Sequence, residues 1–291
     1  MKRKVYEQLL EWKSQEHHKP LILNGVRQCG KTYVLKEFGR QEFDSLAYVS
    51  CDRNVNLQAI YSGDFDVARI IQGLSALTGV DIIPGKTLIF LDEVQAFPQA
   101  LEALKYFCED APEYHIVVAG SLLGVALHAG VSFPVGKVQT LRLFPMDFEE
   151  FLMAMGEEQL LKLMHSHDYE LMNAFHEKLK DLLRQYYYVG GMPEVVKAFA
   201  ENKLLNQVRS LQNEILSNYA SDFSKHAPSQ EVPRIDMVWQ SILGQLSKEN
   251  KKFVYGVLKK GGRAKEFELA IQWLVDAGLV YKLSLIHISE P

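Results

Sequence analysis

The sequence predicts an α/β fold, in which a parallel sheet covered by helices is followed by a helical region and a winged-helix-like segment. A glycine-rich motif at residues 25–32 lies between a short apolar run and a segment with helical spacing. Apolar runs then alternate with helical periodicity as far as residue 152, and helical patterns without strands begin at Gly156. Alternating strands and helices favour a parallel sheet, because each crossover connection places a helix on a face of the sheet.

The elements are predicted in order from their periodicity and their boundary residues. Apolar runs bounded by turn residues predict strands at 20–24, 45–50, 87–93, 114–121 and 137–145. Apolar residues at helical spacing predict helices at 5–18, 33–38, 65–77, 100–110, 122–127 and 147–152. Residues 157–188 are predicted to form helices without strands, further helices are predicted at 206–224 and 265–277, and a final strand at 278–282. We expect domains at 1–152, 153–233 (a helical linker or lid) and 234–282 (winged-helix-like), with a tail at 283–291.

The composition is that of a soluble globular protein, with 47% apolar and 23% charged residues in a chain of 291. A net charge of −4 gives no global reason to expect nucleic acid or an acidic membrane as a partner. The three cysteines, Cys29, Cys51 and Cys108, are widely spaced, which favours reduced thiols in a cytosol. No apolar run reaches the ~18 residues of a membrane helix, and the N-terminus lacks the apolar segment of a signal peptide. We therefore expect a cytoplasmic protein.

The motif GVRQCGKT at residues 25–32 matches the phosphate-binding pattern GxxxxGK[ST] at every fixed position. Its glycines allow a tight turn in which N–H groups point at an anion, and the following helix adds its partial positive charge. Lys31 would reach the β- and γ-phosphates of a nucleotide, and the Thr32 hydroxyl would ligate Mg²⁺. The residues expected to bind the nucleotide are Gly25, Val26, Arg27, Gln28, Cys29, Gly30, Lys31, Thr32 and Tyr33. Oxidation sensitivity of Cys29 is possible in principle, but a tolerated small residue is the better interpretation.

A second signal is the apolar run at 87–93, which ends in two acids. A buried parallel strand places its C-terminal carboxylate at the ligand-binding edge of the sheet. Asp92 would hold Mg²⁺ through bound water, and Glu93 would act as the general base that polarises the attacking water. Many strands end in solvated acids, but the position of this one after the phosphate loop favours the functional interpretation.

Ser121 ends the next predicted strand and has two possible roles. Its hydroxyl could contact the γ-phosphate or the attacking water, as a catalytic residue beside Lys31 and Glu93, or it could cap the helix predicted at 122–127. The sequence leaves both roles open.

The helical region contains three histidines: His165 and His167 fall on different helix faces, and His176 is remote from both. Solvated or capping histidines are therefore favoured over a metal site. The run Tyr186–Tyr188 precedes a glycine turn, and we expect at least one of these tyrosines to pack between domains. A base-stacking platform is the weaker alternative.

Residues 235–282 fit a winged-helix pattern and contain a basic cluster. Seven basic residues stand against one acid, Glu249, in this cluster: Lys248, Lys251, Lys252, Lys259, Lys260, Arg263 and Lys265. Such a cluster can bind nucleic-acid phosphates. The third helix, at 265–277, is mostly apolar, so its sequence favours packing over reading DNA.

Residues 283–291, LSLIHISEP, match the translation of a widely used transposase sequencing adapter. We expect that the natural chain continues differently at this point, and we assign no function to His287. The genomic locus would test this expectation.

Together these motifs resemble a prokaryotic family of AAA+-type ATPases, close to the archaeal-type ATPases, in which a P-loop domain precedes a domain of unknown function. The resemblance covers nearly the whole chain up to Lys282 and also includes the following segments: LFPMDFEEFL at 143–152, GGMPE at 190–194, Tyr219 with Asp222, and WLVDAGLVY at 273–281. It implies Walker A roles for Lys31 and Thr32, Walker B roles for Asp92 and Glu93, and a sensor role for Ser121.

The chain departs from this family before the fifth strand, where Gly136-Lys137 replaces the usual Gly-Arg. Lys137 keeps the charge but lacks the planar fork of arginine, and Arg142 is a weak substitute, so a trans-acting arginine and an oligomer are left undetermined. The family also normally continues into a further domain of ~100 residues or more.

The sequence therefore favours Mg²⁺-dependent ATP binding and hydrolysis that drives a rearrangement of the C-terminal helical part. A P-loop kinase is an alternative, although the Asp92-Glu93 pair suits water activation and no arginine-rich lid is evident. A nucleotide-switched nucleic-acid-binding module is another, supported by the basic cluster. A GTPase is disfavoured, because no guanine-recognition motif occurs.

Overall fold

The computed structural model describes residues 1–52, 54–63, 65–121, 134–249 and 252–283. The chain forms two compact units, Met1–Val208 and Arg209–Pro291. The helix predicted at 122–127, Lys251 and the tail from residue 284 lie outside the described residues.

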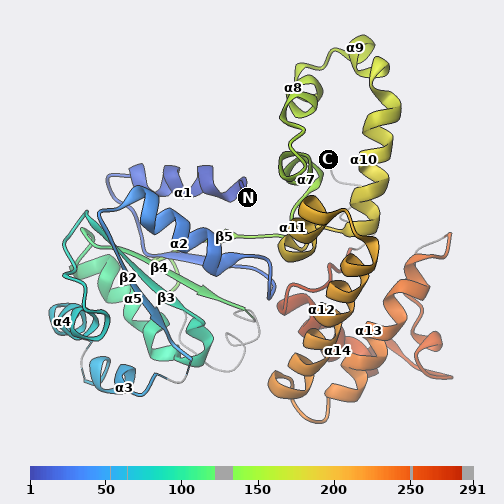
Figure 1. The fold of residues 1–291 in the computed structure, drawn as a ribbon. Coiled ribbons are helices and arrows are strands. Elements are labelled where there is room, and N and C mark those ends of the chain that lie inside the picture. The colour runs from blue at the N-terminus through green and yellow to red at the C-terminus, as the bar shows by residue number, and fades with distance from the viewer. Residues whose placement is uncertain (53, 64, 122–133, 250–251, 284–291) are drawn as a thin grey trace. The chain divides into compact units, whose positions relative to one another are not determined.

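The first unit contains a parallel sheet, whose five strands occur in the order β2-β3-β4-β1-β5 within the described residues (Figure 1). The predicted α/β fold is confirmed. The strands are β1 (Leu21–Asn24), β2 (Ser45–Ser50), β3 (Thr87–Asp92), β4 (His115–Gly120) and β5 (Gln139–Arg142). In this order β1 lies between β4 and β5, so the loop after β1 leaves the interior of the sheet.

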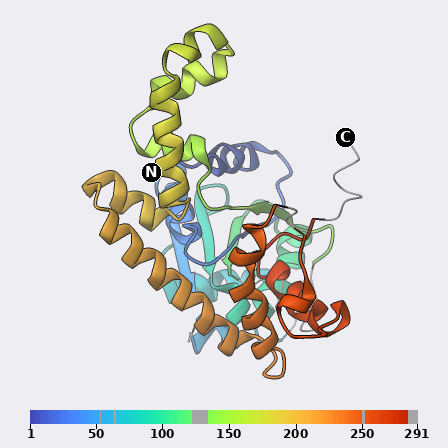
Figure 2. The same cartoon turned by 90° about the vertical axis from the view of Figure 1, so that its right-hand side faces the viewer.

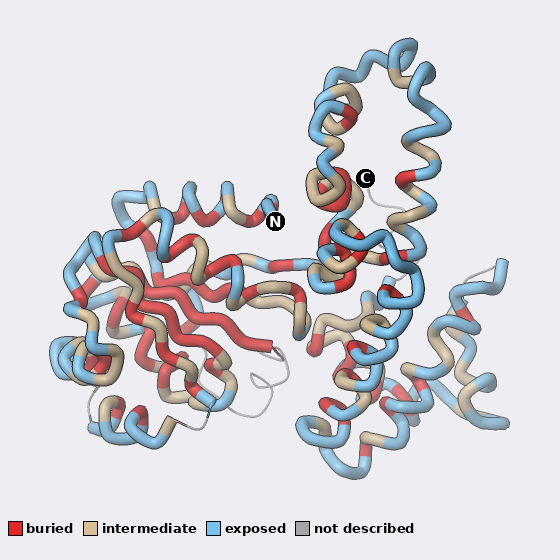
Figure 3. The backbone as a smooth tube through the Cα atoms, in the orientation of Figure 1, coloured by how far each residue is buried: buried red, intermediate tan, exposed pale blue. Residues whose placement is uncertain are grey.

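Helices cover both faces of the sheet, as Figure 1 shows. Side chains of α1 (Val5–Ser14) and α2 (Lys31–Glu42) pack with one set of strand residues. The strand residues of the opposite face pack with side chains of three helices: α3 (Asn56–Ile60), α4 (Val67–Thr78) and α5 (Pro98–Asp110). Successive strand residues point to opposite faces, so a strand between two helical layers must be apolar throughout. All six residues of β3 are buried accordingly, and Figure 3 shows the buried strands.

Helices without strands follow β5 in this unit, as predicted. They are α7 (Phe148–Ala154), α8 (Glu158–Ser166), α9 (Tyr169–Ala174), α10 (His176–Val189) and α11 (Pro193–Asn202), and Figure 2 shows them from a second side. Asp147 and Glu150 form a capping box that begins α7. Of the three tyrosines, Tyr186 packs on Phe148 and Phe151 of α7, whereas the other two are exposed.

The second unit is helical. It contains most of α12 (Leu205–His226), then α13 (Val232–Leu246), a 3₁₀ turn (Tyr255–Val257) and α14 (Ala264–Asp276). Phe223 forms edge contacts with Trp239 and Trp273, which place an aromatic cluster in its core.

One strand prediction is wrong. Residues 278–282 form no strand, and none of the described residues of the second unit forms a strand that could pair with them. An apolar run alone does not make a strand, since its backbone N–H and C=O groups need a partner strand.

None of the helices in the described part of the chain combines the length and the apolar character needed to span a bilayer.

Candidate nucleotide-binding site

The phosphate loop connects β1 to α2, and its shape depends on two glycines. At Gly25, a Cβ would lie 2.3 Å from the carbonyl oxygen of Leu143, so no side chain fits there. Gly30 has φ +97°, in the left-handed region that favours glycine, and the helix begins at the next residue, Lys31. The first turn of α2 therefore directs its free N–H groups at the loop, which is the arrangement that binds anions.

Lys31 lies within the loop. Its Nζ donates hydrogen bonds to the carbonyl oxygens of Gly25 (2.7 Å) and Val26 (2.8 Å). Burial lowers the pKa of Lys31, while the Cys29 thiol and the nearby carboxylates Glu93 and Asp92 act in the opposite direction. A phosphate group would favour the charged amine in the same way as these carboxylates do.

Thr32 and Asp92 meet directly, although 60 residues separate them in the sequence. The Thr32 hydroxyl donates a hydrogen bond of 2.8 Å to Oδ2 of Asp92, and the backbone N–H of Glu93 donates one of 3.1 Å to Oδ1. Burial raises the pKa of Asp92, although these hydrogen bonds favour the ionised form. The structure thus brings the loop, the first turn of α2 and the end of β3 together at one edge of the sheet.

Glu93 has a left-handed backbone, with φ 52°, immediately after β3. This conformation is uncommon for a residue with a side chain and often occurs at functional sites. Gln95 donates a hydrogen bond of 2.5 Å to Oε2 of Glu93, and the buried Ser121 donates one of 3.5 Å to the same oxygen. Ser121 therefore contacts the predicted base, while its possible role as a helix cap concerns residues outside the described ones.

Two side chains of this site were not predicted from the sequence. Tyr48 donates a hydrogen bond of 3.3 Å to Oδ2 of Asp92, and burial together with the Asp92 charge raises the pKa of Tyr48 to about 12. Gln95 is the second. The position of Tyr48 beside Asp92 depends on the pairing of β2 with β3, in which Ser50 pairs with Asp92, and that of Gln95 depends on the turn after β3. A single sequence does not reveal this pairing. A polar residue within an apolar run was the available signal for Tyr48.

The site has the donors that a nucleotide and Mg²⁺ require. No group of three or more His, Cys, Asp or Glu residues in the described parts of the chain could hold a metal ion by itself. Magnesium is commonly bound by one or two protein oxygens together with phosphate oxygens and water. The Thr32 hydroxyl and the Asp92 carboxylate, 2.8 Å apart, supply such oxygens beside the loop.

The other predicted residues have different surroundings. Arg27 and Tyr33 are exposed, and Cys29 is fully buried. Burial raises the pKa of the Cys29 thiol, which disfavours the reactive thiolate and supports the interpretation of a tolerated small residue. Lys137 forms an ion pair of 2.8 Å with Glu109, and the Arg142 guanidinium lies 5.9 Å from the centroid of the Phe144 ring.

Two regions of the chain match the models of known protein families. Residues 17–152 match the model of a family described as an AAA domain, and residues 180–290 match a domain of unknown function. The first half of this chain contains an AAA domain. This result confirms the resemblance to AAA+-type P-loop proteins with a C-terminal domain of unknown function, and it indicates a nucleotide-dependent activity.

The solved structures that resemble this chain are distant from it in sequence. The Walker-type ATPase of Pyrococcus abyssi has a TM-score of 0.61 at 14% identity, over 97% of this chain and 91% of the other. A structure of Drosophila ORC bound to DNA has a TM-score of 0.43 at 12% identity, over 97% and 82% of the two chains. No curated protein matches the sequence. At these identities the similarity to the archaeal ATPase concerns the fold of the AAA domain and its helical extension.

Proposed function

We propose that this AAA domain binds ATP with Mg²⁺ and hydrolyses it. The observation that carries the proposal is the contact of Thr32 with Asp92 beside a glycine-shaped loop, with Glu93 adjacent and held by two side chains. Loop, hydroxyl, carboxylate and base are the parts that nucleotide hydrolysis requires, and they lie at one edge of a parallel sheet.

Each residue has a role that follows from its position. The loop N–H groups bind the phosphates, and Lys31 exchanges its bonds to the carbonyls of Gly25 and Val26 for phosphate oxygens. Thr32 and Asp92 would hold Mg²⁺, which neutralises charge on the phosphates when bound. Glu93 orients the attacking water and accepts its proton, while Ser121 and Gln95 hold the carboxylate in place.

We further propose that hydrolysis changes the arrangement of the helices after β5. The main support is that the segment leading from β5 into α7 contacts both the phosphate loop and the turn before α11. Leu143 lies against Gly25, and the Met146 N–H donates a hydrogen bond of 2.6 Å to the carbonyl of Gly191. A change in the loop therefore has a direct physical route to α11.

Substitution of Glu93 by Gln tests the base. Glutamine keeps the size and the hydrogen bonds of the side chain but accepts no proton, so we expect ATP to bind normally and turnover to fall by about a hundredfold or more. Phosphate release and binding of a fluorescent ATP analogue measure the two effects. Glu11→Gln, on the exposed face of α1, is the matched control and should behave as the unmodified protein. Unchanged turnover in Glu93→Gln would show that another group activates the water.

A second candidate function is binding of nucleic acid by the basic cluster of the second unit. Its described members, Lys248, Lys252, Lys259, Lys260, Arg263 and Lys265, are all exposed. The apolar side of α14, with Phe267 and Leu274, is buried, so the cluster is suited to phosphate contacts rather than to base reading by that side. Binding to DNA or RNA that weakens steeply with salt would support this role, and ATPase turnover with and without nucleic acid would connect it to the first proposal.

A further inference from the structure

Arg3 is a buried arginine whose guanidinium has an acceptor at each of its three nitrogens. Nε donates to Oε1 of Glu150 (3.0 Å), Nη1 to the carbonyl of Cys29 (2.8 Å) and Nη2 to the carbonyl of Phe144 (2.6 Å). The side chains of Arg3 and Glu150 are only 4% and 6% exposed. One side chain thus joins the segment before α1, the phosphate loop, the end of β5 and α7.

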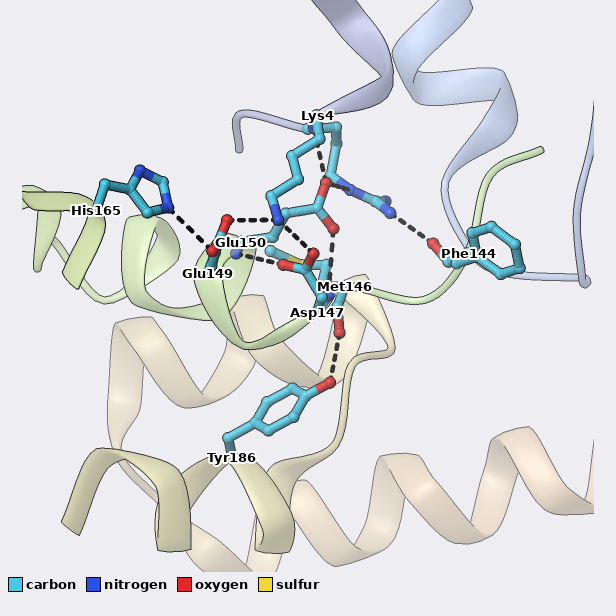
Figure 4. Close-up of polar contacts among 9 residues, drawn as sticks. Lys4, Phe144, Met146, Asp147, Glu149, Glu150, His165 and Tyr186 are labelled. Carbon is cyan, nitrogen blue, oxygen red and sulfur yellow. Dashed lines mark hydrogen bonds and ion pairs between the residues drawn. The ribbon is translucent and has the colours of Figure 1, made fainter. Parts of the chain in front are cut away.

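Glu150 orients the guanidinium of Arg3. Its Oε1 also accepts a hydrogen bond of 2.7 Å from the backbone N–H of Lys4, and its Oε2 accepts one of 3.3 Å from the N–H of Asp147 (Figure 4). The carboxylate is therefore held from both sides, and the Phe144 carbonyl is fixed by the backbone. With Nε and Nη2 bonded to these two acceptors, the guanidinium directs Nη1 at the Cys29 carbonyl in the loop.

The Cys29 carbonyl matters because the same peptide plane contains the N–H of Gly30. A peptide unit is planar, so the direction of the Cys29 C=O sets the direction of the Gly30 N–H on its opposite side. This peptide joins Cys29 to Gly30 (φ 97°), and glycine populates both signs of φ readily. Without a partner for the carbonyl, the backbone at Gly30 permits other orientations of this peptide.

A purely structural role would be met by simpler side chains. A buried ion pair is weak evidence for stability, since well-packed apolar residues commonly replace such a pair at little cost. However, an apolar pair cannot donate a hydrogen bond to the Cys29 carbonyl. Lysine also lacks the planar fork that reaches three acceptors at once. Arginine is therefore required by its two carbonyl contacts, and the one with Cys29 reaches the phosphate loop.

We propose that Arg3 is a positioning residue of the nucleotide site: by holding the Cys29 carbonyl, it fixes the direction of the Gly30 N–H toward the phosphates. The inference rests on the proposed function for the identity of the anion, but not for the geometry of the loop. Within the described residues, the side-chain hydrogen bonds of Arg3 reach Glu150, Cys29 and Phe144, and none reaches Glu93 or Ser121. Arg3 therefore governs nucleotide affinity more than the chemical step.

Two variants and a neighbouring control test the proposal in the full chain. Arg3→Lys keeps the charge but not the fork, and the double variant Arg3→Met with Glu150→Gln removes both buried charges while keeping an acceptor for the capping box. The control is Lys4→Ala, because the Lys4 amine pairs with Asp147 and Glu149 and is partly exposed. All four proteins, including the unmodified one, are compared by melting temperature, nucleotide affinity, ATPase kinetics and ¹⁵N relaxation dispersion of the Gly30 amide without nucleotide.

In both Arg3 variants we expect affinity for a fluorescent ATP analogue to fall by about tenfold or more, with kcat at saturating ATP within about threefold of normal. We also expect exchange on the μs–ms timescale at the Gly30 amide, which the unmodified protein and Lys4→Ala lack. The double variant should melt near the temperature of the unmodified protein, so that a folding defect does not explain these changes.

If either Arg3 variant binds nucleotide normally, or if the Gly30 amide shows no new exchange, the proposal is overturned. If the unmodified protein itself fails to bind ATP, the proposed function is overturned, and the dispersion measurement alone decides whether Arg3 fixes the loop. The two failures are therefore distinguishable.

Discussion

The carboxylate of Asp92 shows at the scale of one residue how a binding site opposes stability. It lies at the end of a buried strand and receives hydrogen bonds from Thr32 and Tyr48. Burial raises the pKa of Asp92, which means that the folded protein disfavours its ionised form. A group with a raised pKa contributes stability below its unfolded value, and that contribution is lost as the pH rises through the folded value.

Asp92→Asn is therefore expected to stabilise the nucleotide-free protein at pH 7, by about 2 °C or more in melting temperature, while abolishing ATP hydrolysis. The amide keeps an oxygen that accepts from Thr32 but carries no charge. Thermal unfolding and phosphate release measure the two effects, with Asp110→Asn on α5 as the control. A lower melting temperature for Asp92→Asn would contradict this account of the buried carboxylate.

At the scale of elements, the connection from β5 to α7 is the main junction of the first unit. It contacts Gly25 through Leu143, and Arg3 through the Phe144 carbonyl. Its next residues reach the turn between α10 and α11: the Met146 N–H bonds Gly191, and the Tyr186 hydroxyl donates a hydrogen bond of 2.9 Å to the Met146 carbonyl. The segments LFPMDFEEFL (143–152) and GGMPE (190–194) therefore contact each other in the fold.

Gly191→Ala is expected to disrupt this junction. An added Cβ would lie 2.1 Å from the Met146 carbonyl oxygen, which is backbone and cannot move aside cheaply. Overpacking of this kind costs about 1–3 kcal/mol in the free energy of unfolding, and chemical denaturation measures it. Gly244→Ala within α13 is the control, because open space surrounds that glycine and alanine favours helix. Equal stability of the two variants would mean that the contact is not tight in solution.

Some of these elements were predictable from the sequence and others were not. The strand at Thr87–Asp92 was predictable, because a short apolar run between turn residues is typical of a strand that helices cover on both faces. The order and the register of the strands were not predictable, so the contact of Tyr48 with Asp92 became known only from the structure. Arg3 looked like part of a basic terminus, since its three acceptors are distant in sequence. The run at 278–282 has strand composition, but the described chain supplies no pairing partner for it.

At the scale of the whole molecule, stability includes a contribution from two stacked histidines. The rings of His18 and His115 lie 3.8 Å apart, and Trp12 and Phe43 contact the His115 ring at its edges. Burial, together with the neighbouring His18 imidazole, lowers the pKa of His115 to about 4, and burial also lowers the pKa of His18. The folded protein thus holds both rings neutral, whereas the unfolded chain protonates them near their ordinary pKa of 6.5.

Because the unfolded state binds these protons first, stability should fall as the pH decreases from about 6.5 toward 4. His115→Phe keeps an aromatic ring against Trp12 and Phe43 but does not titrate, so its melting temperature should decline less between pH 7.5 and pH 5. Thermal unfolding across this range measures the difference, with the exposed His17→Gln as the control. Parallel curves for His115→Phe and the unmodified protein would exclude the ring pair as the cause.

The two hydrogen bonds from the Lys31 amine to the carbonyls of Gly25 and Val26 have a consequence for the rate of nucleotide exchange. These carbonyls are tethered to the amine by a few residues, so they compete with any phosphate at a high effective concentration. In the proposed ATPase, these oxygens would replace the phosphate oxygens of each departing product. This competition would weaken the affinity for nucleotide and would favour release of the product from the proposed site.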